Sequence, residues 1–186
     1  MRPFEREWQH EFSYRDATPS ARVLATVRLA GDNAAVMSIR PAIPQRNEFP
    51  YFRPMVTRWL DNDAYGHINN VVYYEYFDTT VNAFLIEATG TDTRSLGQIG
   101  IVAETGCVFH SSLSFPQPLD IGLAVERLGR SSVTYRLGVF AQRAELAAAT
   151  GKFVHVYVDA QTRRPVEIPA LIRAVLEPLN RASISA

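Results

Sequence analysis

The sequence has very little cysteine, since Cys107 is the only one among 186 residues. One thiol cannot form an intrachain disulfide and cannot supply a cysteine-based zinc site. Such a chain is typical of a reducing compartment. The sequence also lacks an apolar run approaching the roughly 18 residues that cross a membrane, and its N-terminus resembles neither a secretory signal nor a transit peptide. We therefore expect a cytoplasmic protein that has no membrane partner.

An excess of charge of either sign is also missing, because 19 basic residues balance 19 acidic ones. A neutral chain offers no electrostatic reason to bind nucleic acid. Hydrophobic residues make up 47% of the chain and charged residues 20%, which is ordinary for a globular protein. The length suits one domain with a substantial core and an additional segment.

The additional segment is expected at the N-terminus, over residues 1–48. Residues 21–40 fit either a hairpin that turns at Gly31 or two short helices, and the imperfect alternation of apolar residues leaves both open. Three prolines in residues 41–50 are typical of a linker. We predict an N-terminal extension of undetermined structure over residues 1–48 and a main domain over residues 49–186.

The main domain begins with a predicted strand over residues 52–60 and a long helix from Asn70 to Ala88, which Gly90 ends as a C-cap. The polar positions of this helix fall on one narrow stripe, so apolar side chains cover most of its circumference and require burial on several sides. The polar positions are Glu75, Asp78, Thr79 and Asn82, and the apolar ones are Val71, Val72, Tyr74, Phe77, Val81, Phe84 and Leu85.

After this helix the chain is rich in valine, isoleucine, phenylalanine and tyrosine, which predicts four further strands. The strands follow one another without intervening helices, which indicates an antiparallel sheet, and an amphipathic helix follows at residues 170–179. One curved antiparallel sheet wrapped around a single long helix is the simplest α+β arrangement that buries the helix.

The stretch LDNDAYGHINNVVYYEYF, residues 60–77, is dense in polar residues. As a calcium-binding EF-hand loop it fails, because Val72 stands where the bidentate glutamate is required. As a phosphate-transfer loop it lacks both the preceding apolar strand and a second motif downstream. The other histidines are scattered along the chain, so we predict no metal site.

The same stretch also suits a strand-to-helix turn, in which Gly66 takes a difficult backbone angle and Asn69 or Asn70 caps the helix. A carboxylate beside a helix N-terminus stays ionised, and the free backbone N–H groups there can polarise a carbonyl. This combination is what acyl transfer or hydrolysis requires.

A resemblance follows from these residues. The pattern Arg58-x-x-Asp61-x-Asp63-x-x-Gly66-His67-Ile68-Asn69-Asn70-x-x-Tyr73 resembles the signature of hot-dog-fold acyl-CoA thioesterases of the 4-hydroxybenzoyl-CoA thioesterase family. Residues 128–133, 154–159 and 163–169 resemble later segments of that family in the same order. The likeness covers about residues 51–180.

The resemblance implies a hot-dog fold, an acyl-CoA substrate and release of a free carboxylic acid and coenzyme A without a cofactor. It implies a homodimer with active sites at the subunit interface, or a homotetramer. Asp63 takes the position of the catalytic carboxylate, as nucleophile or as general base, and the N–H groups from Gly66 to Asn70 would stabilise the oxyanion. Glu104 is either a catalytic or water-positioning group or a strand-edge salt bridge.

Further roles are expected in and around the loop. The catalytic set is Asp63, Gly66, His67, Asn69, Asn70 and Glu104, in which His67 and Asn69 are expected mainly to hold the loop. The residues expected to bind substrate or coenzyme A are Arg58, Tyr73, Arg130, Ser131 and Ser132.

Each of these assignments has a structural alternative. Tyr73 is equally explained as a packed aromatic, and residues 130–132 as a polar hairpin turn. Asp61 is expected to be structural and paired with Arg58, and His155 to be a packing histidine whose hydrogen bonds are satisfied.

Two other functions stay open at this point. The chain is also explained by a non-catalytic acyl-CoA or lipid-binding protein with the same fold, in which Asp63 is present but unused. A hot-dog hydratase or dehydratase that employs His67 is the other alternative, although the surrounding residues match the thioesterase loop better. The length of the acyl group, and whether it is aliphatic or aromatic, are left open by the sequence.

Overall fold

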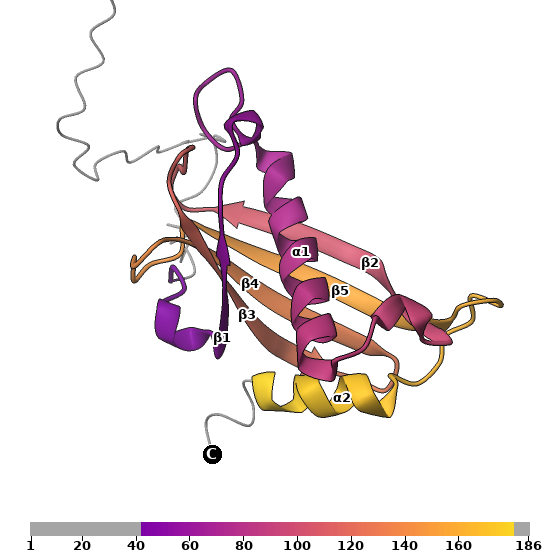
Figure 1. Cartoon of the computed structure of the whole chain (residues 1–186). Helices are drawn as coiled ribbons and strands as arrows, with labels where there is room; N and C mark the ends of the chain where they lie inside the picture. Colours follow the sequence, from indigo (N-terminus) through magenta and orange to yellow (C-terminus); the bar gives the residue numbers. More distant parts are fainter. Residues whose placement is uncertain (1–41, 181–186) are drawn as a thin grey trace, which may run out of the picture. The chain divides into compact units, whose positions relative to one another are not determined.

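The computed structural model describes residues 42–180. Within this range five strands form one antiparallel sheet in the order β1-β3-β4-β5-β2. Helix α1, Asn70–Thr89, lies across one face of the sheet. The shorter helix α2, Ala170–Leu176, lies near the C-terminal end of α1 (Figure 1). The strands are β1 Tyr51–Met55, β2 Gln98–Phe109, β3 Leu119–Leu128, β4 Ser132–Ala141 and β5 Ala149–Asp159.

The long helix is buried along the face that meets the sheet. Its core residues are 9% exposed or less, whereas most of the predicted polar stripe faces outward. Phe77 inserts against β5 at Gly151, where a Cβ atom would lie 2.5 Å from the phenyl ring. Glycine at this position therefore lets the helix approach the sheet closely. Val71 is 62% exposed and does not join the core as the sequence predicts. The buried apolar residues of α1 are Val72, Tyr73, Tyr76, Phe77, Val81, Phe84 and Leu85.

Both ends of α1 are formed as expected. Asn69 is the N-cap, and its side-chain oxygen accepts a hydrogen bond from the N–H of Val71 at 3.2 Å. Gly90 is the C-cap, with a left-handed φ of 63°. A residue without a side chain adopts this backbone angle at little cost.

The first strand is shorter than the sequence predicts. It ends at Met55, and Trp59–Asp61 form a short 3-10 turn instead of continuing the strand. The carboxylate of Asp61 accepts a hydrogen bond from the backbone N–H of Arg58 at 2.7 Å. Such a local bond from side chain to backbone competes with strand pairing, and here it starts the turn that leads to helix α1.

The face of the sheet opposite the helices is partly covered by residues 45–49. Phe49 is 4% exposed and packs edge-on against Phe52 and Phe140. Arg46 pairs with Asp120 at 2.6 Å. Residues 45–49, within the stretch that the prolines predicted to be a linker, are thus ordered against the sheet. The alternatives for residues 21–40 lie outside the described residues, and the division of the chain at residue 48 stays a prediction.

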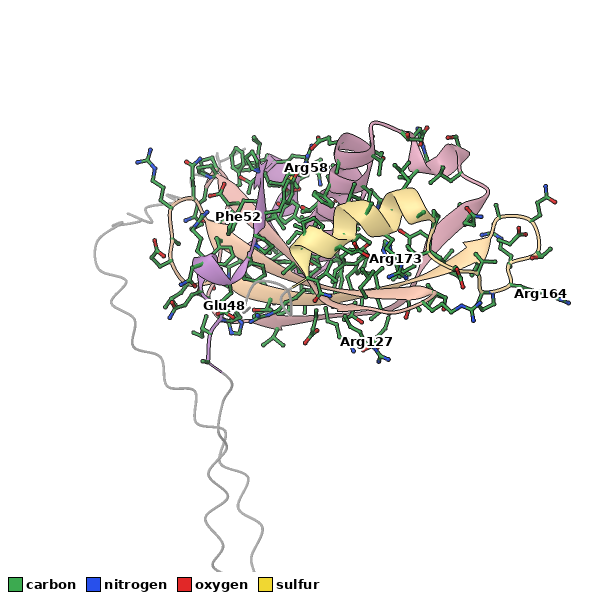
Figure 2. The ribbon with its side chains drawn as sticks, turned by 90° about the horizontal axis from the view of Figure 1, so that it is seen from below. Glu48, Phe52, Arg58, Arg127, Arg164 and Arg173 are labelled. Atoms are coloured by element: carbon green, nitrogen blue, oxygen red, sulfur yellow. The ribbon has the colours of Figure 1, made fainter. Side chains whose placement is uncertain are left out.

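The two faces of the sheet differ clearly in Figure 2, where both helices lie on one side, with Arg173 of α2, and Arg127 lies on the other. None of the described helices is long and apolar enough to cross a membrane.

Candidate active site

A buried carboxylate, Asp61, anchors the loop that precedes α1. Its side chain is 1% exposed and accepts three hydrogen bonds. The donors are the Arg58 backbone N–H at 2.7 Å, the Arg58 Nε at 2.8 Å and the Tyr76 hydroxyl at 2.7 Å. Burial opposes ionisation, but these donors together hold the pKa of Asp61 below its usual value. The predicted pairing of Asp61 with Arg58 is confirmed.

Sequence reasoning did not identify Tyr76 as part of this anchor. Tyr76 is 3% exposed, and burial followed by the hydrogen bond to Asp61 raises the pKa of its hydroxyl. A signal was present, because Tyr73 and Tyr76 are three residues apart and share one face of the helix. A buried tyrosine needs a partner for its hydroxyl, and a carboxylate at the start of the same helix is a suitable one.

The backbone of the loop folds back on itself. The Asp63 N–H donates to the His67 carbonyl at 2.8 Å, and the Gly66 N–H donates to the Asp63 carbonyl at 3.1 Å. Gly66 has a φ of 80°, which confirms that it takes the difficult angle of the turn. The N–H of Asn69 donates to the Asp61 carbonyl at 2.8 Å and so ties the helix cap to the buried anchor.

The carboxylate of Asp63 lies in the middle of this turn and is only partly exposed. Its Oδ1 accepts hydrogen bonds from the backbone N–H groups of Tyr65, at 2.8 Å, and His67, at 3.3 Å. Its Oδ2 has no hydrogen-bond partner within residues 42–180. One oxygen therefore holds the carboxylate in place, and the other is available to a ligand or a water molecule.

Most of the N–H groups predicted to stabilise an oxyanion are already engaged within the chain. Gly66 and His67 donate to Asp63, and Asn69 donates to Asp61. The N–H of Ile68 donates to the Leu113 carbonyl at 2.8 Å. Of the N–H groups from residue 66 to residue 70, only that of Asn70 has no acceptor in the described part of the chain. The geometry thus narrows the predicted group of donors to the first residue of α1.

The remaining loop residues contribute in different ways. The side chain of His67 is exposed, and that of Asn69 is used in the helix cap. Tyr73 is 2% exposed, and its ring packs edge-on against Phe109 of β2 at 5.0 Å. Burial raises the pKa of its hydroxyl to about 12. These contacts agree with the packed-aromatic alternative for Tyr73.

Arg58 bridges two carboxylates in the described structure. It pairs with Asp61 and, through Nη2, with Glu75 of α1 at 2.9 Å. The hydrogen bond to Glu75 and then that to Asp61 raise the pKa of the guanidinium. Arg58 is 57% exposed, so it borders the loop at the surface. Its predicted contact with substrate stays a prediction.

The predicted residues at 130–132 lie far from the loop within one chain. Met55, which precedes the loop, pairs with Leu119 at the start of β3, whereas the hairpin follows the end of β3. Ten strand residues span about 30 Å. The hairpin carbonyls are bound internally, since Arg130 accepts from the Ile168 N–H and Ser131 from the Tyr157 N–H. One chain therefore does not bring these residues to Asp63.

Glu104 lies near the middle of edge strand β2 and is exposed. Its Oε1 forms an ion pair with Lys152 Nζ of β5 at 2.7 Å. This is the strand-edge salt bridge that the sequence left open as an alternative. The catalytic role of Glu104 stays a prediction.

His155 differs from its prediction. It is 3% exposed, as expected of a packing histidine, but its Nε2 has no hydrogen-bond partner within residues 42–180. The prediction that its hydrogen bonds are satisfied is therefore wrong. The reason is local, because the ring lies among the rings of Tyr135, at 5.3 Å, and Phe153, at 4.9 Å, whose ring carbons offer no conventional acceptor. Burial lowers the pKa of His155 to about 4.

Among the described residues, no group of three or more histidine, cysteine, aspartate or glutamate side chains is placed to hold a metal ion. The site is thus a carboxylate, a helix N-terminus and a buried polar anchor.

Comparison with known proteins identifies the family. Residues 57–176 match the family model of the Thioesterase-like superfamily. The chain belongs to this superfamily. A search of the curated proteins returned no match.

Solved structures support the same fold. The crystal structure of the PA5185 protein from Pseudomonas aeruginosa is 45% identical in sequence, with a TM-score of 0.73, over 75% of this chain and 97% of that one. A thioesterase from Thermus thermophilus, solved with coenzyme A and zinc, is 24% identical, with a TM-score of 0.61, over 71% of this chain and 95% of that one. The predicted hot-dog fold is confirmed, while the narrower assignment to the 4-hydroxybenzoyl-CoA thioesterase family stays a prediction.

Proposed function

We propose that this protein is an acyl-CoA thioesterase, which hydrolyses a thioester to a free carboxylic acid and coenzyme A. The observation that carries the proposal is the position of Asp63. It lies beside the N-terminus of a buried helix, with one oxygen held by the loop and the other available. Membership of the thioesterase-like superfamily and the coenzyme A bound to a structural neighbour support the choice of substrate.

In the proposed reaction the free Oδ2 of Asp63 follows one of two routes. It attacks the thioester carbonyl and expels the coenzyme A thiolate, and water then hydrolyses the acyl–aspartate anhydride. Alternatively, it removes a proton from a water that attacks the same carbonyl, and the C–S bond breaks with release of the thiolate. The negative charge that develops on the carbonyl oxygen is stabilised by the N–H of Asn70 and the positive end of α1. The Tyr65 and His67 N–H groups keep the carboxylate oriented, so little reorganisation is needed when the substrate binds.

We propose a homodimer as the working form, and a homotetramer as a further assembly of it. Strand β2 is a long edge strand with exposed apolar side chains on both of its faces, including Val102 at 48% and Val108 at 61%. Such an edge is a template for pairing with another strand. Two copies of β2 that pair antiparallel about a two-fold axis cover each other's exposed side chains.

This pairing also gives a possible binding role to the hairpin at residues 130–132, which lies far from Asp63 within one chain. When the axis passes near the middle of β2, the Gln98 end of one copy lies beside the Phe109 end of the other. The Phe109 end contacts Tyr73 and so adjoins the Asp63 loop. The hairpin at residues 130–132 lies at the Gln98 end, because Ser132 pairs with Val156 near the end of β5 and Gln98 pairs with Asp159. We propose that this hairpin contributes to coenzyme A binding across the dimer.

The test is the variant Asp63→Asn, which keeps an oxygen for the Tyr65 and His67 N–H groups but loses the carboxylate charge. Thiol release from acyl-CoA substrates should fall by about 10²-fold or more. Asp159→Asn is a matched control, because Asp159 accepts similar hydrogen bonds from the N–H groups of Gln161 and Thr162 in an exposed turn. Turnover of the control should match the wild type. Near-normal turnover by Asp63→Asn would contradict the proposal.

The same assay separates the two other functions. A protein that binds acyl-CoA but releases no thiol is a binding protein in which Asp63 is unused. Turnover of an enoyl thioester without thiol release indicates a hydratase.

A further inference from the structure

The connection between β2 and β3, residues 110–118, is tied to the loop that precedes α1. The Ile68 N–H donates to the Leu113 carbonyl at 2.8 Å, and the Thr57 hydroxyl donates to the Gln117 carbonyl at 3.1 Å. These two bonds fasten the connection near the two ends of the loop. Ile68, Leu113 and Thr57 are each 4% exposed, so the contact between the loop and the connection is largely shielded from water.

Asn62 makes a third bond to the connection, in the middle of the loop. Its side-chain Oδ1 accepts a hydrogen bond from the backbone N–H of Phe115 at 3.0 Å. Beside this bond, the ring of Trp59 packs edge-on against the ring of Phe115, with the ring centroids 5.9 Å apart. The loop therefore holds Phe115 through both its backbone and its ring.

The backbone at Asn62 explains why its side chain faces the connection. It is extended, with a φ of −78° and a ψ of 142°, and it pairs with Ile68 in an isolated antiparallel bridge. Successive side chains of an extended chain point to opposite sides. The side chains of Asp61 and Asp63 therefore leave the backbone on the side away from Asn62, which reaches Phe115 instead.

The bonds of the Asp63 carboxylate do not fix the loop relative to the rest of the protein. Both of its hydrogen bonds come from backbone N–H groups of the same loop. The loop is tied to α1 by Asp61, which accepts a hydrogen bond from the Tyr76 hydroxyl, and to the β2–β3 connection by Asn62. Asp63 follows Asn62 directly, so a movement of the loop at Asn62 moves the carboxylate.

We propose that Asn62 is a positioning residue, which holds the carboxylate of Asp63 in place beside the N-terminus of α1. Its bond to Phe115 limits the movement of the loop relative to the sheet, because the connection continues directly into β3 at Leu119. A group that is already in place needs little reorganisation in the transition state. This inference rests on the proposed thioesterase function and adds to it a residue outside the predicted site.

The first test compares two substitutions of Asn62. Asn62→Leu has a similar size but no acceptor, so kcat for thiol release should fall by about 10-fold while KM stays within about twofold of the wild-type value, because a displaced carboxylate slows the chemical step. Asn62→Asp keeps an acceptor oxygen for the Phe115 N–H, and its kcat should stay within about threefold of the wild type. An unchanged kcat in Asn62→Leu, or an equal loss in both variants, overturns the inference.

Thr89→Val is the matched control. The Thr89 hydroxyl donates to the Leu85 carbonyl at 2.6 Å near the C-terminal end of α1. The control thus also loses a hydrogen bond between a side chain and the backbone, but at the opposite end of the helix from Asp63. Both variants should lose thermal stability, whereas kcat should fall only in Asn62→Leu. Equal kcat values in the two variants would show that Asn62 contributes to stability alone.

A double variant tests whether Asn62 acts through Asp63. When Asn62→Leu is added to Asp63→Asn, the residual turnover should stay within about twofold of that of Asp63→Asn, because residues that act as a unit are not additive. A further loss of about 10-fold would show an independent role and overturn the inference. Near-normal turnover by Asp63→Asn alone contradicts the proposed function itself, which is a different result.

Discussion

Two buried polar groups, one near each end of helix α1, differ in whether their hydrogen bonds are satisfied. At the N-terminal end the buried carboxylate of Asp61 has three hydrogen-bond donors. Near the C-terminal half the buried imidazole of His155 has an Nε2 without a partner in the described residues. A satisfied buried group stabilises one conformation, whereas an unsatisfied one reduces stability unless a ligand completes it. The comparison separates a buried group that holds the loop of the site in place from a buried group whose hydrogen bond is left unmade.

The largest effect on stability is expected at Asp61, whose hydrogen bonds are satisfied. Asp61→Asn removes the charge that pairs with Arg58 and leaves the Tyr76 hydroxyl with a poorer partner. At pH 7 the free energy of unfolding should fall by about 3 kcal/mol, measured by urea denaturation.

The pH dependence of that effect has a definite sign. The folded pKa of Asp61 is lowered, so its stabilisation is present above the usual value of 3.8 and is lost as the pH falls through the folded pKa. The difference between wild type and Asp61→Asn should therefore shrink in acid. A difference that is the same at pH 7 and pH 3 would show that the charge of Asp61 is unimportant.

The contribution of His155 to the free energy of unfolding should change over a different pH range. The pKa of His155 falls from its usual 6.5 to about 4 on folding. The unfolded chain therefore binds a proton more readily than the folded one, and stability is lost as the pH falls from 6.5 to 4, by up to about 3 kcal/mol. His155→Phe should remove this loss while remaining folded at pH 7. Thermal unfolding of both proteins across this range checks it, and parallel curves would contradict it.

A smaller effect is expected from Tyr76→Phe, which deletes one hydrogen bond of the Asp61 anchor. A net loss of about 1 kcal/mol in the free energy of unfolding is typical of such a bond. Tyr74→Phe is a suitable control, because its ring packs edge-on against Phe77 at 6.1 Å and its hydroxyl bonds none of the residues that the structure describes. Equal losses in the two variants would remove Tyr76 from the anchor.

The smallest effect on the free energy of unfolding should come from an exposed ion pair that involves neither Asp61 nor His155. Glu104 and Lys152 are 59% and 49% exposed, and exposed ion pairs contribute about 0–1 kcal/mol. Glu104→Gln should change the free energy of unfolding by about 0.5 kcal/mol or less. The same variant also tests the predicted catalytic role, since a loss of turnover of 10-fold or more would support that role.

Much of the architecture was predictable because its signals are local. The helical spacing of the apolar residues, the Asn69 cap and the left-handed Gly90 all concern neighbours within one or two turns. The pairing of Asp61 with Arg58 spans three residues. The hydrogen bond to Tyr76 spans fifteen, and it depends on the angle at which the loop enters the helix.

Local patterns and motif spacing are enough to predict the order of strands and helices, the loop that carries Asp63 and the membership of the superfamily. The folded chain was needed to show that four of the five expected N–H donors are occupied and that the hairpin at residues 130–132 lies far from Asp63 within one chain. It also decided that His155 is left without a partner for Nε2. The physical reason is the strand order β1-β3-β4-β5-β2. This order brings together residues distant in sequence and makes β2 an edge, and no local pattern encodes either result.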